Sequence, residues 1–110
     1  MIRRTFIINS IELPDYAEQY CTTLKDHESS ETICQIEYTY PVDIKLFCVL
    51  LQLIDKYEMT VPDDKYNAAH KAPEWWPKIP KIESMLKLAD WLACDVIIHL
   101  IMLSLRTGET

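Results

Sequence analysis

The sequence predicts a single α+β domain over residues 1–110, a small β-sheet flanked by a cluster of α-helices. A chain of 110 residues has the length of one domain, and its 49% hydrophobic residues suffice for a core without a disulfide or metal to stabilise it. The first half contains two short segments rich in β-branched and aromatic residues, which is typical of strands. From Asp43 onward the chain contains three segments with apolar residues at helical spacing.

The first half predicts a strand, a short helix, a loop and a second strand, in that order. Thr5–Leu13 is the first strand, and Pro14 after it permits a turn or the start of a helix over Asp15–Leu24. Lys25–Thr32 has no apolar anchor, which indicates a mobile acidic loop on the surface. Cys34–Tyr40 alternates apolar and polar residues, the pattern of a half-buried strand.

A long buried helix is predicted to follow Asp43. The Asp43 carboxylate is suited to cap the first turn, because it can accept a hydrogen bond from an otherwise unpaired backbone N–H. Apolar residues then recur at the spacing of a buried helical face, so we expect this helix to be the centre of the core. The face comprises Leu46, Val49, Leu50, Leu53, Ile54 and Tyr57, widened by Phe47, Cys48 and Leu51.

The last part of the chain predicts a proline-rich connection and two helices. Met59–Pro80 contains four prolines and cannot hold a long helix, and so long a connection is more often functional than idle. Lys81–Ala93 returns to helical spacing. Asp95–Leu105 is apolar on nearly every side, so this helix is either enclosed in the core or covered by a partner. We favour a partner, because a terminal element is rarely enclosed all round.

Charge and glycine content exclude several classes of ligand. The net charge is −6, and it is concentrated in Glu12–Glu37, which holds seven acidic residues and one lysine. Without a basic patch to neutralise phosphates, we expect neither nucleic acid nor an anionic membrane as a partner. The only glycine is Gly108, so the glycine-rich loops that bind nucleotide phosphates are absent. The acidic segment either steers association or keeps the chain soluble; cation binding by Asp26–Glu31 is the less favoured alternative to a solvated loop.

Cysteine usage indicates a reducing compartment. The cysteines form no C-x-x-C pair, so their spacing predicts neither a zinc site nor a redox site. No secretory signal precedes the first strand, and we expect the cytoplasm or the nucleus. The cysteines are Cys21, Cys34, Cys48 and Cys94.

The apolar run Leu88–Leu105 has 18 residues, near the length of a membrane span. Asp90, Asp95 and His99 interrupt it and would be stranded in hydrocarbon, so no membrane span is expected.

A small cysteine-dependent enzyme is a distant alternative function. A cysteine nucleophile needs a base within hydrogen-bond reach, and Cys94 with His99 is the nearest pair in the sequence. Five residues place these side chains ~140° apart around a helix, so one continuous helix keeps them from meeting. His27 and His70 lie in predicted loops. We therefore expect no catalytic residue, no metal site and no cofactor.

Three segments carry a resemblance to the Skp and Elongin C family, the BTB/POZ-fold adaptors of cullin ubiquitin ligases. Ile36–Tyr57, IEYTYPVDIKLFCVLLQLIDKY, is similar to the family's third strand and the helix after it. Pro73–Leu92, PEWWPKIPKIESMLKLADWL, is similar to the aromatic and proline connection followed by a helix. The third segment is CDVIIHL with RTGET closing the chain, which resembles the next Skp helix and the run after it. The resemblance implies a BTB/POZ-like fold.

The same resemblance implies two interaction surfaces. The family's penultimate helix offers a polar and an aromatic residue to the cullin, and Asp90 and Trp91 occupy those positions here. In the Skp branch the following helix and the C-terminus bind the F-box of the substrate receptor. The corresponding candidates are Ile97, Ile98, Ile101, Met102 and Leu105.

The sequence departs from the family pattern at both ends. Family members open with strand, turn and strand ending in glycine, whereas only one strand fits before Ser10 and no early glycine exists. The chain stops at Thr110, where Skp proteins continue into further helices that bind the F-box. This is closer to Elongin C, whose partners insert a helix into an apolar groove. We therefore expect a divergent member, shortened at both ends.

The tryptophans each allow two interpretations. Trp91 is either the cullin contact or an aromatic of the core, and its place beside the apolar face of its helix favours the first slightly. Trp75 and Trp76 lie between prolines. They are either anchors for a partner, since aromatics dominate interface energetics, or a cover for the underside of their own connection.

The sequence thus predicts a non-catalytic protein–protein adaptor, with no membrane or nucleic-acid role. Its expected partners are a cullin-type scaffold and an F-box or BC-box-like substrate receptor, in a hetero-oligomer. The alternative is a Skp-like subunit repurposed to scaffold another complex without a cullin.

Overall fold

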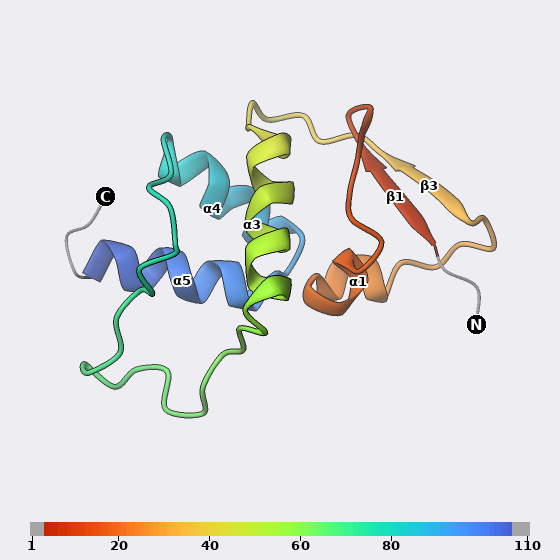
Figure 1. Ribbon diagram of the computed structural model, residues 1–110. Helices are drawn as coiled ribbons and strands as arrows, with labels where there is room; N and C mark the ends of the chain where they lie inside the picture. The colour runs from red at the N-terminus through yellow and green to blue at the C-terminus, as the bar shows by residue number, and fades with distance from the viewer. Residues whose placement is uncertain (1–3, 107–110) are drawn as a thin grey trace.

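The strands and the long helices lie at opposite ends of the molecule (Figure 1). The computed structural model describes residues 4–106, so Gly108 and the last four residues of the RTGET run lie outside the described part. A three-stranded mixed sheet occupies one end, and α1 lies between this sheet and the helices α3, α4 and α5. The observed class is α+β with five helices, which confirms the predicted class.

The N-terminal segment forms a β-hairpin rather than the one strand predicted over Thr5–Leu13. Strands β1 (Thr5–Ile8) and β2 (Ile11–Glu12) pair antiparallel, joined by Asn9 and Ser10 with φ of 49° and 70°. Two successive residues with positive φ are the turn that suits strand twist, and Asn tolerates it. The Asn9 amide also donates to the Tyr38 carbonyl at 2.8 Å and accepts from the Tyr38 N–H at 2.9 Å. The hairpin therefore exists without a glycine.

Strand β3 (Ile33–Ile36) completes the sheet in the order β2-β1-β3, parallel to β1. It is shorter than the predicted Cys34–Tyr40, because Tyr38 gives its backbone groups to Asn9. The predicted helix Asp15–Leu24 is split into α1 (Ala17–Tyr20) and α2 (Thr22–Lys25). The break is Cys21, which is extended with φ −117° and ψ 99°.

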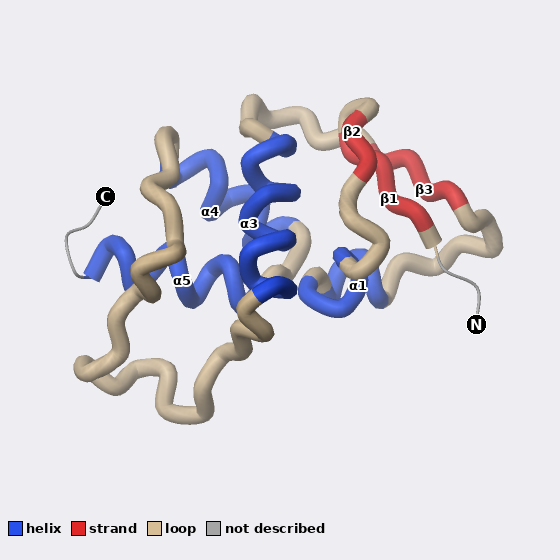
Figure 2. Tube along the Cα trace, viewed as in Figure 1, coloured by secondary structure: helices blue, strands red, loops and turns tan. Residues whose placement is uncertain are grey.

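Helix α3 (Ile44–Lys56) stands at the centre of the molecule, as predicted (Figure 2). The Asp43 carboxylate accepts from the Leu46 N–H at 3.0 Å, so the predicted cap is confirmed. The buried face is turned from the predicted one: Val49 is 44% and Tyr57 46% exposed. The buried face has moved toward Phe47 and Leu51, two of the residues that were predicted only to widen it. The buried residues are Ile44, Phe47, Leu50, Leu51 and Ile54.

The proline-rich connection has no helix or strand, and it leads to α4 (Ile82–Trp91) and α5 (Asp95–Arg106), as predicted. The corner between these helices is tight. Ala93 has φ 52°, and the N–H groups of Ala93 and Cys94 donate back to the carbonyls of Asp90 and Ala89 at 3.0 and 2.9 Å. This is the hydrogen-bond pattern of a left-handed helix cap, here built on alanine. No helix in the described part of the chain is long and apolar enough to cross a bilayer.

Candidate functional site

Helix α5 divides its apolar residues between the core and the surface. Ile97 and Ile101 are completely buried, so the expectation that they face a partner is wrong for these two residues. They pack inward because α4 and α3 cover that side of α5. Met102 is 52% and Leu105 41% exposed, and Ile98 is partly buried. The outward face of α5 thus presents these last three candidates.

A groove lies along this outward face. Its volume is about 690 Å³, and its wall opposite α5 is formed by Val61, Lys65 and Tyr66 of the connection. We call it the α5 groove. Sequence reasoning found its α5 side but missed the opposite wall, because no periodicity relates the connection to the helix. The α5 residues that line it are Asp95, Ile98, His99, Met102, Leu103, Leu105 and Arg106.

The connection is tied to the end of α5 by one side chain. The Arg106 guanidinium donates to the carbonyls of His70 at 2.7 Å and Asn67 at 3.3 Å. His70 Nε2 in turn lies 2.9 Å from the Asp64 carboxylate, and this hydrogen bond lowers the pKa of Asp64. These contacts hold the turn over residues 64–70 against α5, which keeps the opposite wall of the groove in place.

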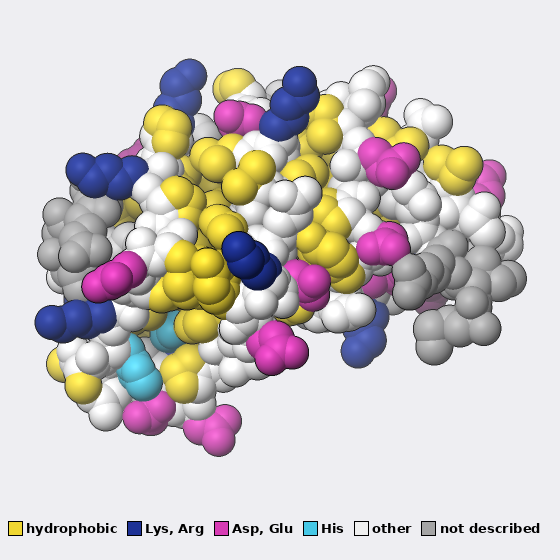
Figure 3. Space-filling view, viewed as in Figure 1, with side chains coloured by type: hydrophobic (Ala, Val, Ile, Leu, Met, Phe, Trp, Pro, Cys, Tyr) yellow, Lys and Arg dark blue, Asp and Glu magenta, His cyan; other side chains and the backbone are white. Residues whose placement is uncertain are grey.

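The groove is more basic than the molecule as a whole. Lys65 and Arg106 lie on its wall with a single acid, Asp95, in a chain of net charge −6. Burial lowers the pKa of His99, and the neighbouring His70, Lys65 and Arg106 lower it further. His99 is therefore neutral at pH 7, so the positive charges on the wall of the groove are those of Lys65 and Arg106. Apolar side chains also gather in the middle of the face drawn in Figure 3, with charged side chains around them.

A second surface forms at the end of α4, where Asp90 is exposed and Trp91 is 42% exposed. The Trp91 ring lies 5.0 Å from the ring of Tyr38, which lies 5.7 Å from that of Tyr40. Lys87 Nζ lies 3.7 Å from the centre of the Tyr40 ring, a cation–π contact. We call Tyr38, Tyr40 and Trp91 the aromatic face.

Trp91 is thus neither a core residue nor isolated. Sequence reasoning missed its neighbour Tyr38, which comes from the segment after β3 in a distant part of the chain. Tyr38 itself is only 7% exposed, and its hydroxyl is buried without a hydrogen-bond partner. Burial raises the pKa of this hydroxyl, so it stays protonated and retains a hydrogen to donate.

The tryptophans of the connection take different positions. Trp76 is 8% exposed and belongs to the core, so it is no free anchor for a partner. Its ring lies 6.2 Å from that of Trp75, within the same connection. Trp75 is partly buried and stacks on Tyr57 with ring centres 4.5 Å apart. This stack leaves Trp75 at the edge of the core.

Cys94 and His99 lie in different parts of the structure. Cys94 is completely buried, with its sulfur against that of Cys21, whereas His99 lines the α5 groove. Residues 4–106 contain no group of three or more His, Cys, Asp or Glu side chains placed to hold a metal ion. The acidic loop over residues 26–32 is fully exposed.

No family model, curated protein or solved structure matches the chain. The geometry therefore carries the functional argument. It offers two surfaces, the α5 groove and the aromatic face, and the helices α5 and α4 that contribute to them are joined by a hydrogen-bonded corner at Ala93. Such an arrangement is suited to holding two partners in a fixed relation.

Proposed function

We propose that the chain is a non-catalytic adaptor of the Skp and Elongin C type, with a BTB/POZ fold, that links a substrate receptor to a cullin-type scaffold. The α5 groove is the observation that carries this proposal. A hollow of about 690 Å³ beside two exposed apolar side chains, Met102 and Leu105, is a place where a partner can bury apolar area.

The order of elements supports the fold part of the proposal. Two strands, two short helices, an acidic loop, a third strand, an Asp-capped helix, a proline-rich connection and two helices follow one another, an order similar to that of the family the sequence resembles. The chain also opens with strand, turn and strand, as family members do, with Ser10 at the end of a turn that needs no glycine. One of the two sequence departures from the family is thereby removed.

The receptor segment that fits the α5 groove is an amphipathic helix of the F-box or BC-box kind. Its apolar residues would contact Ile98, Met102 and Leu105 along one face of α5. Acidic residues flanking that apolar face would meet Lys65 and Arg106, and this complementarity would select among helices of equal hydrophobicity. Burial of about 500 Å² of apolar area contributes on the order of 10 kcal/mol before association and ordering costs.

The cullin-type scaffold would meet the aromatic face. Asp90 and Trp91 stand together at its edge, and aromatic residues with an adjacent charge are typical of interface hot spots. Lys87 and Asp90 supply opposite charges on either side of the aromatic face, which would define the orientation of the partner. The two partners then bind to different helices and do not compete.

The test is affinity purification from a cell extract with quantitative mass spectrometry, using two double variants and one single control variant. Met102→Asp with Leu105→Asp should lose the receptor, and Asp90→Lys with Trp91→Lys should lose the cullin. Val49→Asp is the matched control, because Val49 is as exposed as Leu105 but lies on α3. It should lose neither partner.

The outcomes separate the proposal from its alternatives. A stable set of partners without any cullin would favour the repurposed scaffold subunit. If the Asp90 and Trp91 variant binds the cullin as well as the unchanged chain, the second surface is wrongly assigned. If no partner depends on Met102 and Leu105, the adaptor proposal is refuted.

A further inference from the structure

Two cysteines that are far apart in the sequence face each other in the core. Cys21 is the residue before α2, and Cys94 is the residue before α5. The first N–H groups of α2 donate to the last carbonyls around the end of α4: Thr22 to Ala93 at 3.3 Å and Thr23 to Leu92 at 3.2 Å. Helix ends carry such unpaired groups, and here each end satisfies the other. One residue further along each of these two segments, Cys21 lies opposite Cys94.

The two thiols are neighbours and shielded. The backbone pairing places Cys21 opposite Cys94, each thiol shifts the pKa of the other, and neither residue has any exposed surface. The other cysteines lie elsewhere, with their sulfurs near backbone carbonyls: Cys34 at 3.6 Å from that of Glu31, and Cys48 at 3.9 Å from that of Glu12. The fold therefore selects one pair of the four thiols.

The surroundings make the two thiols unequal. The interaction with Cys21 lowers the pKa of Cys94, as does the backbone N–H of Ile97 in the first turn of α5, whereas burial acts in the opposite direction. The interaction with Cys94 raises the pKa of Cys21, and burial raises it further. Thiolates, not thiols, attack disulfides, and the N-terminus of a helix stabilises a thiolate. Cys94 is thus the nucleophile of the pair, and Cys21 the thiol that resolves.

We propose that Cys21 and Cys94 form a site of reversible disulfide formation, oxidised by thiol–disulfide exchange with a small disulfide such as oxidised glutathione. The proposal does not rest on the adaptor function. The sequence did not predict a redox site, because the two cysteines are in no C-x-x-C motif and only the contact between α2 and the corner at Ala93 brings them together.

The exchange balances in two steps. The Cys94 thiolate attacks one sulfur of glutathione disulfide, the disulfide bond breaks, and glutathione leaves as a thiolate that takes up the proton of Cys94. The Cys21 thiolate then attacks the Cys94 sulfur of the mixed disulfide, and a second glutathione leaves with the proton of Cys21. Two protein thiols are oxidised, and one glutathione disulfide is reduced to two thiols.

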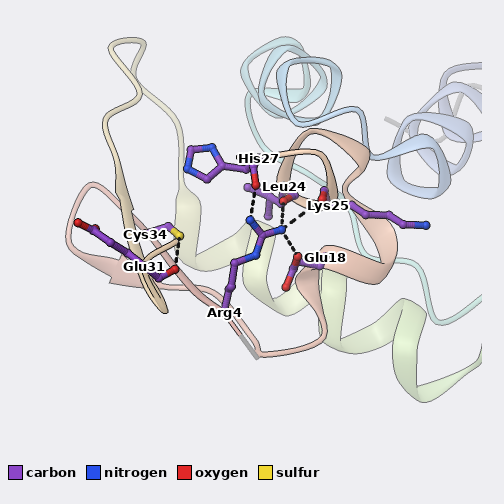
Figure 4. Close-up of polar contacts among 7 residues, drawn as sticks. All are labelled: Arg4, Glu18, Leu24, Lys25, His27, Glu31 and Cys34. Atoms are coloured by element: carbon purple, nitrogen blue, oxygen red, sulfur yellow. Dashed lines mark hydrogen bonds and ion pairs between the residues drawn. The ribbon is translucent and has the colours of Figure 1, made fainter. Parts of the chain in front are cut away.

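Arg4 ties together α1 and the end of α2, the segment that contains Cys21 (Figure 4). The Arg4 guanidinium donates to the carbonyls of Leu24 at 3.0 Å and Lys25 at 3.2 Å, to that of His27, and to the Glu18 carboxylate at 2.5 Å. Helices of one turn have little stability of their own, so these contacts keep the segment closed. Local opening of α1 and α2 would expose the two sulfurs to glutathione.

The experiment uses the full chain, folded, in buffers with graded ratios of reduced to oxidised glutathione. Samples are quenched with acid, free thiols are blocked with N-ethylmaleimide, and trypsin is added. Cleavage after lysine and arginine leaves each cysteine in a separate peptide, so the pairing is read directly from the masses. The peptides are residues 5–25, 26–45, 46–56 and 88–106.

We expect peptides 5–25 and 88–106 to be linked, at about tenfold less oxidised glutathione than any other pair requires. The double variant Cys34→Ser with Cys48→Ser should form the same link. Cys21→Ser should stop at the mixed disulfide on Cys94, and Arg4→Ala should form the link faster. The proposal is overturned if Cys21 and Cys94 both stay free, in the unchanged chain and in Arg4→Ala, while Cys34 or Cys48 takes up glutathione.

Discussion

Replacing Ala93 by glycine should stabilise the protein, although glycine normally weakens a chain. Ala93 has φ 52°, a left-handed conformation in which a residue with a Cβ is less stable than glycine by roughly 1–2 kcal/mol. Against this, glycine loses about 0.5–1 kcal/mol through its greater freedom in the unfolded chain. The half-buried methyl group contributes a further loss of under about 0.5 kcal/mol. The net gain is on the order of 0.5 kcal/mol.

Ala89 provides the matched control, since it is an alanine four residues before Ala93, within the regular part of helix α4. It lies within α4 and is completely buried. The same change there costs about 1 kcal/mol in helix propensity and about 0.8 kcal/mol for the lost buried methyl group. The two variants have the same composition, so the unfolded state affects both alike. Their free energies of unfolding should differ by about 2 kcal/mol.

The assay is urea unfolding followed by tryptophan fluorescence, with the free energy obtained by linear extrapolation. Ala93→Gly should raise the midpoint without changing the slope, and Ala89→Gly should lower it. If Ala93→Gly loses as much stability as Ala89→Gly, then the corner between α4 and α5 is not left-handed at Ala93, and the rigid relation between the two surfaces loses its basis.

Three further predictions follow from the same structure. Asp43→Ala removes the cap of α3 and should cost about 1 kcal/mol in urea unfolding, whereas Asp63→Ala in the connection should change the stability by less than about 0.5 kcal/mol. Because the pKa of His99 is lowered from its ordinary 6.5, the unfolded chain takes up this proton first, and stability falls as the pH drops through 6.5 toward the folded value. His99→Gln should therefore lose less thermal stability than the unchanged chain between about pH 8 and about pH 5, and an equal loss would contradict this. Ile101→Asp, at a completely buried position, should unfold the chain in circular dichroism, whereas Met102→Asp, at a position 52% exposed, should keep the fold; unfolding in both would place the whole of α5 in the core.

The low glycine content has a structural consequence. Five residues other than glycine take positive φ among the described residues: Asn9, Ser10, Glu58, Lys81 and Ala93. The only glycine in the chain occupies none of these positions. The turn at Asn9 is therefore held by its hydrogen bonds to the backbone of Tyr38, and not by a glycine.

The sequence by itself determined the α+β class, the cap of α3 at Asp43, the absence of a long helix in the connection and the existence of α4 and α5. These features depend on local signals: helical spacing, a capping carboxylate and proline. It also pointed to α5 as a helix with more apolar residues than one buried face needs, but it named the buried Ile97 and Ile101 together with the exposed Met102 and Leu105 as partner-facing candidates.

Only the tertiary structure decided which face of each helix is buried and which distant residues meet. Ile97 and Met102 look alike in sequence, and the packing of α4 and α3 on one side of α5 separates them. Tyr38 reaches Trp91, and Cys21 reaches Cys94, through contacts between segments far apart in the chain. The hairpin at Asn9 is of the same kind, since its stabilising partner is the backbone of Tyr38. Local sequence cannot encode such partners, because the free energy that selects them comes from packing and hydrogen bonds formed only when the whole chain folds.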